Sequence, residues 1–160
     1  NMPRALPLLL GDTVKAVESF DRHMPQEVPR VALVDTFKDE DEESLNVAAS
    51  LRERLRGIRL DTPPERGGVT ADMVIELRSR LDQAGFRHVE VFVSGAFTPE
   101  RIAQFVEKNA PVNGFAVGSY ISSASPNDFT ADIHEVDGRP IAKRGRTPGI
   151  TPSPRLDRVM

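Results

Sequence analysis

Two acidic side chains, each followed by a threonine, end short apolar runs in the first half of the sequence. They are Asp35-Thr36, after Val31 to Val34, and Asp61-Thr62, after Ile58 to Leu60. A carboxylate can accept hydrogen bonds from ribose hydroxyls, or it can hold Mg²⁺ through water. A strand-end aspartate can also cap the helix that follows. Because the pattern occurs on consecutive runs, we favour a ligand site with Asp35 and Asp61 as its acidic groups and as its candidate magnesium ligands.

Small residues end two later apolar runs. Ser94-Gly95 follows Val89 to Val93, and Gly118-Ser119 follows Phe115 to Val117. Glycine lets the backbone approach an anion closely, and unpaired N–H groups before a helix point at it. A single pair of this kind is more often only a tight turn, but late strands of a barrel-like sheet commonly share one phosphate. We therefore predict a phosphate site at these two strand ends.

Arg59 lies two residues before Asp61, so the two side chains share one face of a strand. A buried arginine requires an anionic partner, and either Asp61 or an acidic substrate could be that partner. The acidic run from Asp39 to Glu43 favours a solvated first turn of a helix over a metal site. None of the histidines follows a strand, so we predict no histidine acid or base.

The elements that must position these residues alternate along the chain. Continuous apolar runs separated by amphipathic helical patterns are typical of a parallel sheet covered by helices. In such folds the carboxyl ends of the strands open onto one rim, where ligands bind. The sequence therefore predicts an α/β fold, a partial (β/α) barrel of about five parallel strands. The expected strands are Leu6 to Leu10, ending at Gly11-Asp12-Thr13, and the four apolar runs named above.

Helix boundaries are predicted by local signals. Thr70 and Thr98 stand at N-cap positions, and Pro99 suits a first helical position. Gly57 is a plausible C-terminal stop for the helix that begins in the acidic run.

The pattern changes beyond Tyr120. Asp137-Gly138 lies between two short extended runs, which predicts a β-hairpin. The tail is rich in proline and arginine and poor in apolar residues, which is typical of an extended arm. We divide the chain into a partial barrel over residues 1–127, a hairpin over 128–145 that closes or extends the barrel, and a tail over 146–160.

Composition excludes several function classes. The chain has 160 residues, a net charge of -3 and no cysteine. The near-neutral charge gives no sign of a nucleic-acid partner, and no run is long enough to span a membrane. The absence of cysteine excludes disulfides, thiolate zinc sites and thiol catalysis. We expect a cytoplasmic protein.

Taken together, the strand-end strings resemble the barrel half of the nicotinate phosphoribosyltransferase family, a type II phosphoribosyltransferase. The resemblance runs from residue 1 to about residue 146. It implies formation of nicotinate mononucleotide from nicotinate and 5-phosphoribosyl 1-pyrophosphate, coupled to ATP hydrolysis, in NAD biosynthesis. The strings that carry it are Val34-Asp35-Thr36-Phe37-Lys38-Asp39-Glu40, Arg59-Leu60-Asp61-Thr62, Val93-Ser94-Gly95 and Ala116-Val117-Gly118-Ser119.

The resemblance also implies a role for each residue. The 5-phosphate would bind at Ser94, Gly95, Gly118 and Ser119. Asp61, with Asp35 and Thr36, would face the ribose and the pyrophosphate with Mg²⁺, and Arg59 would face the base or the pyrophosphate. The implied catalytic residues are Asp61, Arg59 and Asp35, and the implied substrate-binding residues are Thr36, Thr62, Ser94, Gly95, Gly118 and Ser119.

The sequence departs from the family pattern at three positions. Arg4 stands where such relatives carry a histidine tied to the ATP-driven step, which puts ATP as a co-substrate in doubt. Ala96 and Ala116 replace glycines near the phosphate. These departures keep a second hypothesis open, a non-catalytic homologue that acts as a binding or assembly subunit. A quinolinate-using relative is a third.

The resemblance also bears on partners. The family's N-terminal domain, which helps to close the base pocket, is not part of this sequence. We expect activity only with that domain, on the same polypeptide or on a partner chain, and we expect a homo-oligomer.

Overall fold

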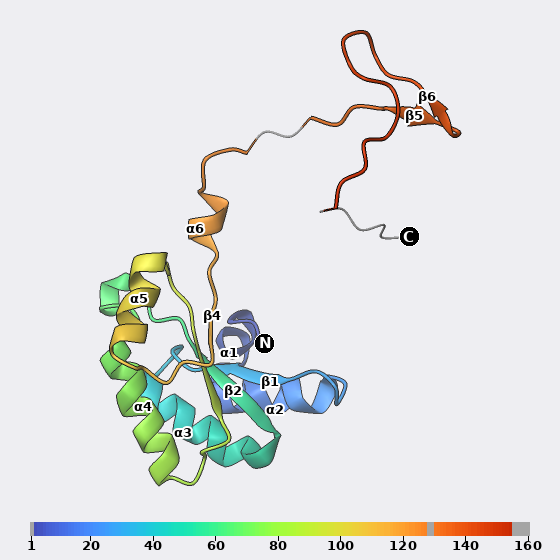
Figure 1. Ribbon diagram of the computed structural model, residues 1–160. Coiled ribbons are helices and arrows are strands. Elements are labelled where there is room, and N and C mark those ends of the chain that lie inside the picture. The colour runs from blue at the N-terminus through green and yellow to red at the C-terminus, as the bar shows by residue number, and fades with distance from the viewer. Residues whose placement is uncertain (1, 128–129, 155–160) are drawn as a thin grey trace. The chain divides into compact units, whose positions relative to one another are not determined.

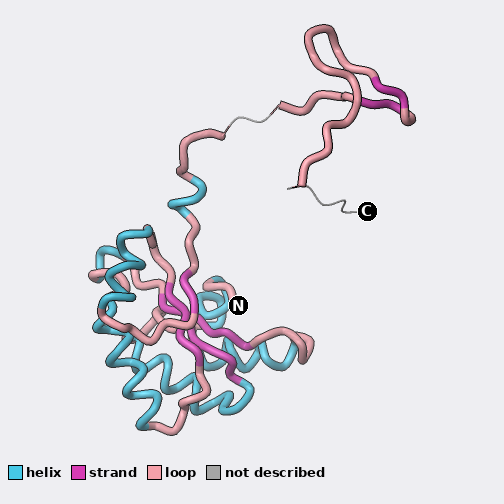
Figure 2. The backbone as a smooth tube through the Cα atoms, in the orientation of Figure 1, coloured by secondary structure: helices cyan, strands magenta, loops and turns pink. Residues whose placement is uncertain are grey.

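The computed structural model describes residues 2–127 and 130–154. The chain divides into two compact units, Asn1–Ala124 and Ser125–Met160. Figures 1 and 2 show a parallel sheet with its helices in the first unit and a small hairpin in the second. No helix in the described ranges is long and apolar enough to cross a membrane.

The sheet of the first unit has four parallel strands in the order β1-β2-β3-β4. Each crossover therefore leads to the next neighbour in the same direction, and right-handed crossovers of this kind place all their helices on one face. Figure 1 shows α2 to α5 along the same side of the sheet. The predicted α/β partial barrel is confirmed, with four strands rather than five. The strands are β1 (Arg30–Leu33), β2 (Leu55–Leu60), β3 (Glu90–Val93) and β4 (Gly114–Phe115).

The core lies between the sheet and these helices. Ile58 and Leu60 of β2 and Val91 and Val93 of β3 are fully buried, as alternation along a strand requires. The helices contribute apolar residues at helical spacing, such as Val74, Leu77 and Leu81 of α4. The covering helices are α2 (Thr13–His23), α3 (Glu40–Leu51), α4 (Ala71–Gln83) and α5 (Pro99–Glu107), with 3-10 turns η1 (Arg52–Arg54) and η2 (Pro64–Arg66).

The prediction of a first strand over Leu6 to Leu10 was wrong, because these residues form helix α1 (Ala5–Leu10). Leucine and alanine, which are not β-branched, favour a helix over a strand, and proline is tolerated in a first helical turn. Gly11 ends the helix in the left-handed conformation, with φ of 68°.

The backbone beside β1 is provided instead by the start of the chain, where the Met2 N–H donates to the Val31 carbonyl at 2.9 Å. Arg4 therefore lies near the strand ends in place of the expected Gly11-Asp12-Thr13. Asp12 caps α2 by accepting a hydrogen bond from the Lys15 N–H at 2.7 Å.

Gly57 was wrongly predicted to end a helix, since it lies inside β2. A Cβ atom at this position would lie 2.9 Å from Cε2 of Phe92 and 2.8 Å from the Glu90 carbonyl. A Cβ at Gly114 of β4 would lie 3.0 Å from Cδ1 of the same ring. The Phe92 ring therefore packs against two strands where only glycine leaves room, and this requirement outweighs the usual role of glycine as a stop signal.

The predicted helix caps are confirmed. Thr70 accepts a hydrogen bond from the Met73 N–H at 3.2 Å, and Thr98 accepts one from the Arg101 N–H at 3.3 Å. These caps fix the starts of α4 and α5, which follow the ends of β2 and β3. After β4 the chain forms the short helix α6 (Ser119–Ser122).

The second unit contains the predicted hairpin. Strands β5 (Glu135–Val136) and β6 (Arg139–Pro140) pair antiparallel around Asp137-Gly138. Both turn residues have positive φ, 48° and 73°, as a two-residue hairpin turn requires. Residues 128 and 129, at the start of the predicted hairpin segment, and the tail residues 155–160 lie outside the described ranges.

Candidate active site

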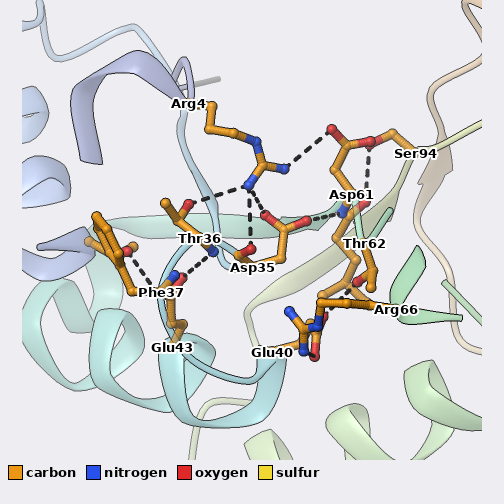
Figure 3. Close-up of polar contacts among 12 residues, drawn as sticks. Arg4, Asp35, Thr36, Phe37, Glu40, Glu43, Asp61, Thr62, Arg66 and Ser94 are labelled. Carbon is orange, nitrogen blue, oxygen red and sulfur yellow. Dashed lines mark hydrogen bonds and ion pairs between the residues drawn. The ribbon is translucent and has the colours of Figure 1, made fainter. Parts of the chain in front are cut away.

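Three of the predicted residues lie at consecutive strand ends and are joined by hydrogen bonds (Figure 3). The N–H of Asp61 donates to Oδ2 of Asp35 at 2.7 Å. The Ser94 hydroxyl donates to Oδ1 of Asp61 at 2.7 Å and to the Leu60 carbonyl at 3.0 Å. The ends of β1, β2 and β3 therefore form one continuous polar cluster, Asp35-Asp61-Ser94.

Arg4 lies between the two aspartates. Its Nη1 is 2.6 Å from Oδ1 of Asp35, and its Nη2 is 3.4 Å from Oδ2 of Asp61. Nη1 also donates to the Thr36 hydroxyl at 3.4 Å. The pKa of Arg4 is raised: burial acts to lower it, but the hydrogen bonds and charges of Asp35 and Asp61 together outweigh burial. The guanidinium is therefore a permanent cation at this rim.

A magnesium ion does not fit this arrangement as it stands. Each of the four carboxylate oxygens of Asp35 and Asp61 already faces an N–H, a hydroxyl or the Arg4 guanidinium. The Asp35 side chain is 0% exposed, and its Oδ1, which accepts no hydrogen bond among the described residues, is in ion-pair contact with Arg4, so a hydrated ion cannot reach it while Arg4 is in place. Within the described part of the chain, no cluster of three or more potential metal ligands occurs.

Two acids at the start of α3 hold the loops that follow β1 and β2. Glu43 accepts hydrogen bonds from the N–H groups of Thr36, Phe37 and Lys38 at 2.8 to 3.2 Å. Glu40 accepts one from the Thr62 hydroxyl at 2.7 Å. The predicted solvated turn was therefore wrong for these two buried residues, because their carboxylates replace water as acceptors for the loops.

The two threonines of the predicted site differ in their surroundings. Thr36 is half-buried and faces Arg4, so it lies in the cluster. Thr62 is buried, and its hydroxyl is directed at Glu40 instead of the rim. Its contribution to this site is therefore to fix the loop after β2.

Arg59 lies on β2 opposite Phe92 of β3. Of the two partners predicted for Arg59, Asp61 is not among its contacts in the described chain; the Asp61 carboxylate contacts Arg4 instead. The Nε atom of Arg59 is buried and has no hydrogen-bond partner in the described chain. A buried donor of this kind is costly unless a ligand pairs with it.

The turn after β3 contains two consecutive residues in the left-handed region and is held by an arginine of α5. Gly95 and Ala96 both have positive φ, 101° and 51°. Arg101 of α5 donates to their carbonyls at 2.6 and 3.2 Å and to the Val69 carbonyl at 2.9 Å. Among the described residues, the N–H groups of Gly95 and Ala96 donate to no acceptor. The turn therefore directs its carbonyls at Arg101 and leaves its N–H groups available to a ligand.

Gly118 and Ser119 follow the carboxyl end of β4, which pairs with β3 so that Val93 lies opposite Phe115. They therefore lie at the same edge of the sheet as the turn after β3. The Ala116 N–H donates to the Val93 carbonyl at 2.8 Å, which extends this pairing towards Gly118. In the described chain, no hydrogen bond joins Gly118 or Ser119 to Ser94 or Gly95. Both lie on the exposed surface at the start of α6.

Comparison with protein families matches residues 2–132 to the C-terminal domain of quinolinate phosphoribosyl transferase. The chain belongs to this family. The predicted resemblance is therefore confirmed at the level of phosphoribosyltransferases of the NAD-biosynthesis type. Most of the first unit, with the Asp35-Asp61-Ser94 cluster, falls inside the matched residues.

Two relatives are similar to this phosphoribosyl transferase domain. Nicotinate phosphoribosyltransferase pncB2 of Mycobacterium tuberculosis is 33% identical over 110 residues, which are 68% of this chain and 22% of that protein. The crystal structure of nicotinate-nucleotide pyrophosphorylase from Pyrococcus furiosus is 45% identical with a TM-score of 0.74, and the match covers 94% of this chain and 38% of that chain. The chain thus spans about a fifth of the first and well under half of the second.

Sequence reasoning missed three parts of this site. Arg4 was treated as a departure from a family pattern and not as the partner of the aspartates. Glu40 and Glu43 could have been found from their spacing, because together with Ser44, Val47 and Leu51 they form one stripe of α3. Arg101 gave no signal, because a helical arginine is usually a surface residue.

Proposed function

We propose that this chain is the phosphoribosyl-binding part of an enzyme that forms nicotinate mononucleotide from nicotinate and 5-phosphoribosyl 1-pyrophosphate. The observation that carries this proposal is the Asp35-Asp61-Ser94 cluster at three adjacent strand ends. It lies beside a turn with free N–H groups and includes the end of the strand that carries Arg59, whose buried Nε has no hydrogen-bond partner among the described residues. Family membership and the names of both relatives support a pyridine nucleotide as the product.

In this proposal the residues act mainly through charge. The nicotinate nitrogen forms a bond to the ribosyl carbon as the bond to pyrophosphate breaks, so positive charge develops on the ribose and negative charge on the leaving group. Asp61, whose side chain is 33% exposed, stabilises the ribose. The free N–H groups at Gly95, with Gly118 and Ser119, bind the 5-phosphate.

The proposed base is nicotinate. Arg59 is the β2 cation whose Nε lacks a partner in the described chain, and a single carboxylate suffices to pair with it. Nicotinate has one carboxylate, whereas quinolinate has two. We therefore assign the base carboxylate or the pyrophosphate to Arg59 and rank quinolinate second.

ATP is not assigned to the site. A guanidinium has no acceptor lone pair, and that of Arg4 is held by two carboxylates. We propose that residue 4 accepts no phosphoryl group, so that any coupling to ATP in the whole enzyme uses other residues.

Calorimetric titration with 5-phosphoribosyl 1-pyrophosphate tests the site, and pyrophosphate release with nicotinate or quinolinate tests the reaction. The chain is assayed within its full polypeptide or with a complementary N-terminal domain. Binding followed by nicotinate-dependent release supports the proposal, whereas release with quinolinate alone would reassign the base.

A non-catalytic homologue is the second candidate, because every oxygen of the two aspartates already has a protein partner. If 5-phosphoribosyl 1-pyrophosphate binds but no pyrophosphate is released in the presence of either base, this second function is established. The absence of binding would exclude both.

A further inference from the structure

The Arg4 guanidinium occupies the place that a metal ion would take between Asp35 and Asp61. Its two terminal nitrogens face different carboxylates, at 2.6 and 3.4 Å (Figure 3). We propose that Arg4 is the resident cation of this acidic pair and excludes divalent metal ions from it. The inference rests on the proposed function for the importance of the two carboxylates, but its test uses no substrate.

Charge and burial support this assignment. Asp35 is 0% exposed and Asp61 is 33% exposed, so the first has no contact with water and depends on Arg4 for neutralisation. The remaining oxygens accept the Asp61 N–H and the Ser94 hydroxyl, each at 2.7 Å. A metal ion would have to displace the guanidinium before it could bind between the two carboxylates.

Arg4 is therefore a positioning residue for Asp61. It holds Oδ2 while Ser94 holds Oδ1, so the carboxylate is fixed from both sides. It also places a positive charge beside the group that we propose faces the pyrophosphate, where a cation stabilises the departing negative charge.

The sequence offers a matched control for the removal of a cation near an acid. Arg66 is 3.4 Å from Oε2 of Glu40, which is also buried. Unlike Arg4, Arg66 contacts one carboxylate, and Glu40 also binds the Thr62 hydroxyl. Its removal therefore does not uncover two carboxylates that had shared one cation.

The test is titration of the chain with Mn²⁺, followed by paramagnetic broadening of the backbone amide signals. The unmodified chain and Arg66→Ala should show no selective broadening at Asp35, Asp61 and Ser94. Arg4→Ala should show it at all three, with a gain in Mn²⁺ affinity of at least about tenfold, because a positive charge has been removed within a few ångströms of the ion. Arg4→Lys, with one point charge, should lie between the two.

Selective broadening in the unmodified chain equal to that in Arg4→Ala would overturn the proposal. It would also be overturned if neither Arg4→Ala nor Arg4→Lys gained affinity for Mn²⁺. If Arg4→Ala does not fold, Arg4→Lys alone decides. Binding of 5-phosphoribosyl 1-pyrophosphate to the unmodified chain is measured separately without metal. Its failure counts against the proposed function and not against the role of Arg4.

Discussion

At the scale of single residues, Asp35 and Asp61 share a cation but differ in exposure. Asp35 is inaccessible and also accepts the Asp61 N–H, whereas Asp61 lies partly open to the solvent. The buried carboxylate therefore maintains the structure of the rim, and the open one is free to meet a substrate.

This difference predicts opposite effects of two substitutions. Asp61→Ala should abolish turnover in the complete enzyme and change the free energy of unfolding by less than about 1 kcal/mol, because its ion pair is partly hydrated. Asp35→Ala should lower the free energy of unfolding by about 2 kcal/mol, because the Asp61 N–H loses its acceptor and Arg4 keeps only the more distant of its two carboxylates. Urea denaturation and a pyrophosphate-release assay measure the two effects. An Asp61→Ala variant that unfolds would show that this residue is structural.

At the scale of elements, α5 holds the turn after β3 through Arg101. The Arg101 guanidinium also donates to the Val69 carbonyl, and it lies 4.5 Å from the centre of the Phe97 ring. One side chain thus joins the turn to the loop before α4. The comparable Arg78 of α4 donates to the carbonyls of Phe86 and Val89, which both lie in the segment before β3.

Substitution of Arg101 and of Arg78 should show which of them affects ligand binding and which affects only local stability. Arg101→Met should increase hydrogen exchange at Gly95 and Ala96, and it should weaken binding of 5-phosphoribosyl 1-pyrophosphate, because the carbonyls of the turn lose the guanidinium that donates to them. Arg78→Met should increase exchange near Val89 and leave that affinity within about twofold, since a change without effect on the site costs well below 1 kcal/mol there. Equal weakening in both variants would mean that α5 acts only through general stability.

The β2–β3–β4 packing gives a second prediction for the elements. Gly57→Ala should lower the free energy of unfolding by about 1 to 3 kcal/mol, because its Cβ would overlap both the Phe92 ring and the Glu90 carbonyl. Gly85→Ala serves as a control that meets no neighbouring atom, although it has a positive φ of 90°. Thermal unfolding of the two variants separates overlap from backbone strain. An unchanged midpoint for Gly57→Ala would show that the strands can move apart.

At the scale of the whole molecule, global stability should depend on the ionisation of Asp41. Burial raises the pKa of this carboxyl above its ordinary value of 3.8, and Arg80 only partly opposes the shift. Because the folded chain binds this proton more tightly than the unfolded chain, the contribution of Asp41 to stability is fully present below pH 3.8. It is lost as the pH rises through the folded pKa.

Asp41→Asn should therefore remove this part of the pH dependence. In urea denaturation from pH 3 to 7, the stability of the unmodified chain relative to the variant should decrease as the pH rises. If stability depended on pH in the same way in both proteins, the raised pKa of Asp41 would be contradicted.

Much of this architecture could be predicted from local signals, because strand ends, threonine caps and the Asp137-Gly138 turn are encoded by neighbouring residues. The start of the chain could not, since the Leu6 to Leu10 run satisfies both strand and helix patterns and only tertiary contacts decide. Arg4 was missed for the same reason: its partners are 31 and 57 residues away. The grouping of Asp35, Asp61 and Ser94 at one rim follows from strand order, whereas their individual partners required coordinates.

The Phe92 ring against Gly114 has a consequence for sequence variation among relatives. The nearest atoms to a Cβ at position 114 all belong to that ring, at 3.0 and 3.2 Å. A bulkier residue at 114 should therefore be tolerated only where position 92 has become smaller. In an alignment of relatives, these two positions should covary, so that a change at either one is found together with a compensating change at the other.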